Sequence, residues 1–266
     1  MATTESPATH VRAGTDVSAL SFGTVLRSGL FAGLVAGVVA ALVAWLVVER
    51  PIRAALAIEE ARSHAEAGEH HEELYSQPVQ VIGGMVAAVV VAVSIAIIFA
   101  VVFARVRHRL PAATDFGRAT LLAGVGFATI SLLPALKYPA NPPGVGDPES
   151  ITSRTLYYVS FIGAMMVVAY LAFLARERLV ALGWPAAYRS AALVAGTVVV
   201  VAVLGVLWPA NPDSISADIG APLLWQFRLS SLLELATLWA VLGLVFGLLL
   251  TPRPAKAHPA KDQDKS

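Results

Sequence analysis

The sequence predicts an all-α fold, a polytopic membrane helical bundle with six spans arranged as three outward-capped hairpins. The first observation is composition: 57% of the 266 residues are hydrophobic and 14% are charged, against about 25% charged residues in soluble domains. The second is that the apolar residues gather into six long intervals. The third is a Pro-Ala-Asn-Pro corner that closes two of these intervals. These features exclude an ordinary soluble enzyme.

The apolar intervals hold 18 to 31 residues, and a bilayer crossing needs about 20. Five contain no Asp, Glu, Lys or Arg, and the last contains only Glu234. The six predicted spans are 28–48, 74–104, 119–136, 155–175, 190–212 and 229–252.

Polar segments flank this membrane domain. The first apolar run has full spanning length and no obvious small-residue cleavage site, so we expect an uncleaved first span. The tail is rich in Pro, Lys and Ala and cannot bury a core, which predicts disorder. We therefore divide the chain into a polar cytoplasmic segment 1–24, a membrane domain 25–250 and a cytoplasmic tail 251–266.

The Lys and Arg residues predict the orientation. Of the 19 in the chain, 13 fall in the two terminal segments and the second and fourth connections, and 6 fall in the other three connections. Positive charge is retained on the cytoplasmic side. We therefore expect a multi-pass protein of the cell membrane with both termini cytoplasmic and with connections 49–78, 137–154 and 208–228 outside.

Charge and missing motifs narrow the function further. The net charge is +1, which gives no support for nucleic acid as a partner; the lipid bilayer is the expected partner. The chain has no cysteine, so thiolate metal sites and cysteine nucleophiles are excluded. No phosphate-binding loop is present, which excludes an ATPase. No nucleophile and base constellation is legible, and we expect neither an enzyme nor a resident cofactor.

The first outer connection could bind metal. Residues 49–78 carry seven glutamates, three arginines and three histidines. Glu60 and His64 are four apart, as are Glu66 and His70, so on a helix each pair would share a face. Imidazole with carboxylate is a suitable ligand set for divalent cobalt, nickel or zinc. The alternative is a solvated acidic helix with incidental histidines. The candidate metal ligands are His64, His70, His71, Glu60 and Glu66.

The Pro-Ala-Asn-Pro repeat marks the outer ends of the third and fifth spans. Proline stops the preceding helix, so structural punctuation is one explanation for both corners. The third connection also gathers carbonyl and carboxylate oxygens at the membrane surface, where irregular backbone can line a wet cavity. Its candidate ion-pathway residues are Asn141, Asp147 and Glu149, with Asn211 at the second corner.

Glu234 is the one acidic residue inside a predicted span. An unpaired carboxylate there is costly and usually faces a pathway or a partner, so we place Glu234 on the ion path; a structural carboxylate near the interface is the alternative. Two glycine series at four-residue spacing predict close helix contact instead. They are Gly29, Gly33 and Gly37 in the first span and Gly243 and Gly247 in the last.

Several of these segments resemble one family. The outer segment Leu136–Glu149, followed by Arg154, closely resembles the predicted cobalt transporter subunit family CbtA. Trp208-Pro209, the segment Leu224–Leu232 and the acidic connection from Glu59 to His71 are similar to it as well. The resemblance extends over roughly residues 25 to 250.

The resemblance implies a membrane subunit that imports divalent cobalt, linked to cobalamin-dependent regulation. It also implies a small single-span partner of the CbtB type with a histidine-bearing terminus. Two alternatives stay open: a non-transporting membrane scaffold, and a transporter of nickel or another divalent metal, since imidazole and carboxylate accept these ions too.

Overall fold

The structure, a computed structural model, describes residues 20–65, 77–146, 148–212, 215 and 219–252. The long helices are α1 (Phe22–Val43), α2 (Glu49–Ala65), α3 (Gln77–Val106), α4 (Asp115–Gly126), α6 (Ile151–Ala181), α7 (Ala186–Leu207) and α8 (Ala221–Leu250). Shorter elements are the π-helices η1 (Ala44–Val48) and η3 (Phe127–Leu132), α5 (Leu133–Lys137), and the 3-10 turns η2 (Arg107–Arg109) and η4 (Pro148–Ser150).

Within the described residues, six helical stretches are long and apolar enough to cross a membrane. This confirms the all-α, six-span prediction. The first stretch runs from Phe22 to Arg62, because α1, η1 and α2 form one continuous helix. The connection between the first two spans therefore begins as an extension of the first span. The expected disorder of the tail concerns mainly residues 253–266, which lie outside the described residues.

Local sequence explains where several helices start and stop. The hydroxyls of Ser21 and Thr114 accept the backbone N–H of Thr24 and Gly117, which caps α1 and α4, as expected for hydroxyl side chains at helix starts. Gly183 has φ +76° and ends α6 in a left-handed turn that glycine favours. Pro185 then precedes α7.

Both π-helices are followed closely by proline. Pro51 comes three residues after η1, and Pro134 comes two residues after η3. Proline has no N–H to donate to the preceding turn, and π segments interrupt the regular ladder at such places. In η1 the N–H of Glu49 bonds to the carbonyl of Ala44, five residues earlier.

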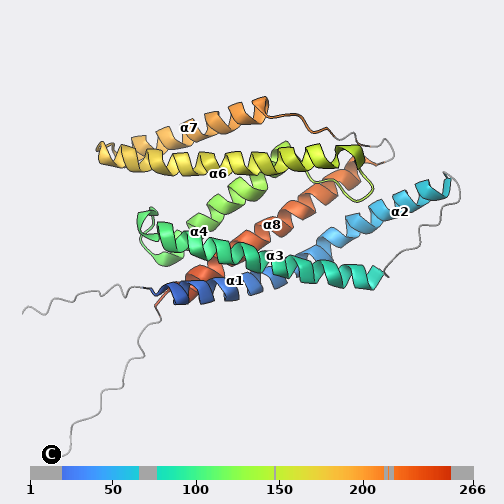
Figure 1. The fold of residues 1–266 in the computed structure, drawn as a ribbon, viewed down its shortest axis with the longest axis horizontal. Helices are drawn as coiled ribbons and strands as arrows, with labels where there is room; N and C mark the ends of the chain where they lie inside the picture. The colour runs from blue at the N-terminus through green and yellow to red at the C-terminus, as the bar shows by residue number, and fades with distance from the viewer. Residues whose placement is uncertain (1–19, 66–76, 147, 213–214, 216–218, 253–266) are drawn as a thin grey trace, which may run out of the picture.

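The spans do not pack simply in sequence order (Figure 1). The start of α1 and the end of α8 lie at the same end of the bundle. α1 packs against α3 and α8, and α8 also packs against α4. α7 packs against α6. The expected arrangement as three outward-capped hairpins is therefore not confirmed, although α1 and α3 do form an adjacent pair.

Small residues join α1 to α3. A Cβ added to Gly33 would lie 2.5 Å from the Cβ of Ala96, and Gly29 and Gly37 meet alanines of α3 in the same way. Gly243 of α8 likewise faces Ala123 of α4. This confirms the prediction that both glycine series serve close helix packing. We call these contacts the glycine–alanine seam.

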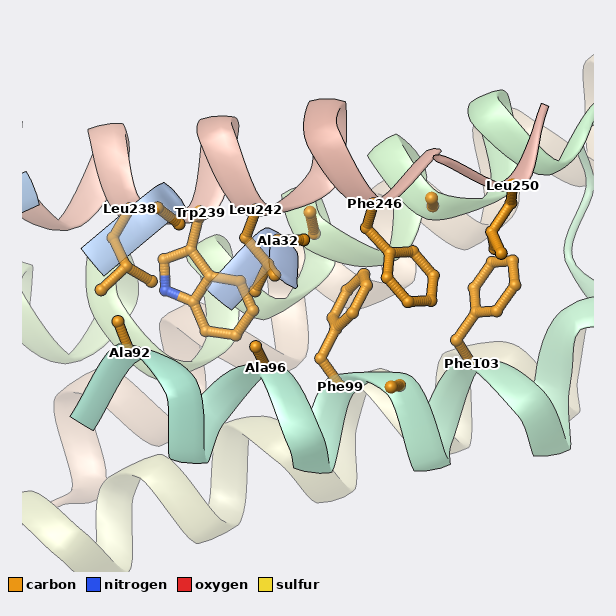
Figure 2. Packing of buried hydrophobic residues seen from close by; sticks show 14 of the residues in the cluster. Ala32, Ala92, Ala96, Phe99, Phe103, Leu238, Trp239, Leu242, Phe246 and Leu250 are labelled. Carbon is orange, nitrogen blue, oxygen red and sulfur yellow. The ribbon is translucent and has the colours of Figure 1, made fainter. Parts of the chain in front are cut away.

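Aromatic residues fill the core beside this seam. Figure 2 shows Phe99 and Phe103 of α3 pointing toward Phe246 of α8, with centroid distances of 5.2 and 5.0 Å in edge-to-face geometry. Trp239 of α8 donates its indole N–H to the hydroxyl of Ser131, a buried residue of η3, at 3.0 Å. The four helices α1, α3, α4 and α8 thus form one packed body.

Candidate functional site

Glu234 lies on a cavity between four elements of the bundle. The cavity has a volume of about 320 Å³ and is walled by η1, α2, α3 and α8. Most of its lining is apolar, and its polar side chains are Glu49, Arg53, Gln80 and Glu234. Since a water occupies roughly 30 Å³ in the liquid, the volume is sufficient for a small cation with part of its hydration shell.

Glu234 is half-buried on this wall. Within the part of the chain that the structure describes, its carboxylate has no hydrogen-bond or ion-pair partner. A carboxylate inside a membrane span usually faces a pathway or a partner. Its position on the cavity makes it available to a cation from that space.

An ion pair lies on the wall that α2 forms. Arg53 donates its Nε–H to Glu49 at 2.9 Å, one helical turn apart on α2. The Glu49 side chain is 19% exposed and that of Arg53 is 60% exposed. Both side chains line the cavity, and the carboxylate is the more buried of the two.

The first Pro-Ala-Asn-Pro corner is held by Arg228 of α8. The guanidinium donates to the carbonyl of Ala140 at 3.2 Å and to the side-chain oxygen of Asn141 at 3.1 Å. Arg228 precedes Glu234 by six residues, a rise of about 9 Å along the helix. The corner is thus held at a level of α8 nearer to the start of the helix than Glu234 is.

The two corners also bind each other. Tyr138 donates its hydroxyl to the carbonyl of Pro209 at 2.7 Å. Burial raises the pKa of Tyr138 above its ordinary value, so the phenol keeps the proton that it donates. Phe161 of α6 lies between Tyr138 and Trp208, with centroid distances of 5.9 and 5.7 Å. We call this group the aromatic brace.

The acidic helix α2 reaches the third and fifth connections. Ile58 packs against the buried cluster of Val145, Ile219 and Leu224. A Cβ at Gly144, which has φ +71°, would lie 2.7 Å from a carboxylate oxygen of Glu59. Helix α2 is therefore docked onto the third and fifth connections.

Most of the predicted metal ligands lie where the structure does not test them. Glu66, His70 and His71 fall outside the described residues, and only the backbone of His64 is described, on α2. Glu60 is exposed on the same helix and has an interaction partner. Among the described residues, no three His, Asp or Glu side chains are grouped to hold a metal ion. The histidine site stays a prediction.

The other predicted pathway residues are dispersed. Asn141 is engaged by Arg228. Glu149 is exposed and Asn211 is half-buried, and each has an interaction partner. Asp147 lies outside the described residues. None of these residues lines the Glu234 cavity.

Three polar residues of the cavity are not among the predicted site residues: Glu49, Arg53 and Gln80. A signal was available for the first two: Glu49 is the first carboxylate after a 21-residue apolar span, and Arg53 follows at helical i,i+4 spacing. Their proximity to Glu234 depends on how α2, α3 and α8 meet, which no local pattern specifies.

Comparison with known proteins gives one match. A protein-family model described as "Probable cobalt transporter subunit (CbtA)" matches residues 22–251. No curated protein and no solved structure matches the chain. The matched region includes all six candidate spans, the cavity and both corners. On this match the chain belongs to the CbtA family of probable cobalt transporter subunits.

Proposed function

We propose that the protein imports divalent cobalt across the cell membrane, for use in cobalamin synthesis, with Glu234 on the ion path. The observation that carries the proposal is a carboxylate without a partner among the described residues, on a cavity inside the membrane domain of a chain of this family. A transporter of this kind has a charged group that binds the ion within the membrane, and Glu234 is in a position to be that group.

The path begins on the outer side. Helix α2 carries Glu59 and Glu60, and the negative potential of the acidic connection attracts the hydrated cation. His64, His70 and His71, with Glu60 and Glu66, exchange water ligands for imidazole and carboxylate. The oxygens of Asn141, Asp147, Glu149 and Asn211 border the access route, and Glu234 receives the ion within the membrane.

Glu234→Gln tests this path. The substitution keeps the shape of the side chain and removes the charge, so the protein should still insert and accumulate. Cobalt uptake by purified protein in liposomes should fall at least about tenfold, because removal of one charge-assisted contact costs about 1.5 kcal/mol or more.

Glu177→Gln is the matched control. Glu177 lies on α6 and pairs with Arg109 at 4.0 Å, away from the cavity. Its Gln variant should transport normally. Unchanged uptake by Glu234→Gln would reject the pathway role, and loss of the protein itself would indicate a structural carboxylate.

The topology can be checked because the native chain has no cysteine. We predict that a single cysteine introduced at position 64 reacts with an impermeant reagent in intact cells, whereas one at position 257 is protected. The opposite result would reverse the orientation and exclude capture by α2 from outside.

A non-transporting scaffold is the alternative, and the family description as a subunit is consistent with a partner. We propose that this partner is a small single-span subunit of the CbtB type. A scaffold gives no uptake in liposomes without its partner, whereas our proposal expects uptake by this chain. Competition by nickel and other divalent ions in the same assay measures the ion selectivity.

A further inference from the structure

We propose that Glu49 is a second cation-binding carboxylate of the Glu234 cavity and that Arg53 is its resident counter-ion, which a transported cation displaces. The identity of the cation as cobalt rests on the proposed function. The binding site itself rests on the cavity, the ion pair and the position of Glu234.

The geometry places both carboxylates on one space. Glu49 belongs to the first turn of α2 and Glu234 to α8, and both line the same cavity. Gln80 of α3 adds an amide to the lining. Carboxylate and amide oxygens are ligands that divalent cations accept.

The ion pair is exchangeable. Arg53 is 60% exposed, and it holds Glu49 through an Nε contact at 2.9 Å. Exposed pairs of this i,i+4 type contribute little to stability, and the long arginine side chain can turn outward into solvent. The pair is therefore weak enough to open when a cation competes for the carboxylate.

Exchange of the Arg53 guanidinium for a divalent cation balances the charge of the cavity. With both glutamates ionised, the cavity carries two negative charges and one positive charge from Arg53. When the guanidinium leaves, two carboxylates remain, which matches one divalent cation. Arg53 thus neutralises part of the cavity while no ion is bound.

The backbone before Glu49 fixes its direction. The π-helix η1 ends at Val48, and the N–H of Glu49 bonds to the carbonyl of Ala44. Trp45 and Val48 of η1 form part of the cavity wall. A π segment rotates the following residues relative to a regular helix, and such segments are frequent at functional sites.

The test is equilibrium dialysis of cobalt(II) with full-length protein purified in detergent. To remove the outer histidines, every protein carries His64→Ala, His70→Ala and His71→Ala. Arg53→Gln should tighten cobalt binding about fivefold, the effect of removing one competing charge at about 4 Å in a wet site. Glu49→Gln should weaken binding about tenfold.

Two further proteins make the test specific. Arg50→Gln removes the same charge from an exposed position of α2 that does not line the cavity, and it should leave the affinity unchanged. The double variant Glu49→Gln, Arg53→Gln should bind cobalt no more tightly than Glu49→Gln alone, because the carboxylate for which the arginine competes is gone.

Equal effects of Arg50→Gln and Arg53→Gln, or tightening by Arg53→Gln in the absence of Glu49, would overturn the proposal. So would affinities that do not respond to Glu49→Gln. Liposome uptake is measured separately with the native chain. Binding that follows the expected pattern without uptake would reject cobalt import alone, and uptake with binding insensitive to Glu49 would reject the second carboxylate alone.

Discussion

The body formed by α1, α3, α4 and α8 and the pair α6–α7 are built in different ways. In the first, glycines of one helix contact alanine side chains of its neighbour, so the helices pack closely, and Phe and Trp rings fill the core between them. In the second, α7 has no buried residue and attaches through α6 and the aromatic brace. Close small-residue packing gives contact along a whole helix, whereas the brace fixes one end. Two walls of the cavity, α3 and α8, belong to the first body.

The largest effect is expected from Gly33→Leu in the seam. The new Cβ would meet the Cβ of Ala96 at 2.5 Å and the Cα of Val93 at 3.0 Å, and backbone cannot turn aside. Overpacking of this kind costs about 3 kcal/mol or more. The melting temperature in detergent should fall by several degrees at least. Gly196→Leu on α7 has open space within 4 Å and should melt like the native protein.

Asp115→Asn should have the next largest effect. Asp115 accepts from Arg107 at 2.6 and 2.5 Å and from Arg118 at 3.0 Å, and these side chains are 15%, 7% and 22% exposed. Loss of the carboxylate charge leaves two guanidinium groups in a partly buried site. Because breaking such a pair costs about 3 kcal/mol when fully buried, we expect about 2 kcal/mol here. Denaturant unfolding measures it, and a change below about 0.5 kcal/mol would contradict a structural role.

Tyr138→Phe should have the smallest and most local effect. The ring contacts remain and the hydrogen bond to the Pro209 carbonyl is lost, which costs about 1 kcal/mol. Hydrogen exchange should increase at the 207–212 corner while the α1–α3 seam stays protected. Tyr170→Phe, at an exposed position of α6, is the control. Equal loss of protection in the seam would show that the two regions are one cooperative unit.

Composition and hydropathy were sufficient to predict the helices and the glycine contacts. Long runs without charged residues indicate membrane spans, and glycine at every fourth residue indicates a helix face that packs closely against another helix. The packing order was not predictable, because α8 meets α1 and α4 across long stretches of sequence and lipid-facing and helix-facing residues are equally apolar here.

The candidate site was only partly predictable for the same reason. Glu234 was recognisable as a charge inside a span. Glu49 resembles any residue of a solvated acidic helix until α8 is placed beside it. The repeated corners were recognisable, but the role of Arg228 in holding Asn141 depends on residues 87 positions apart.

The continuous helix from Phe22 to Arg62 has a mechanical consequence. Its 41 residues correspond to about 60 Å at 1.5 Å per residue, twice the ~30 Å hydrocarbon core. Helix α2 supplies 17 of these residues, about 25 Å of length, and its far end is separated from Glu49 by more than the ~8 Å over which charges act in physiological salt. An ion held there affects Glu49 only by travelling down the helix or by bending it. A 10° bend at η1 would displace the far end by about 4 Å, given that length.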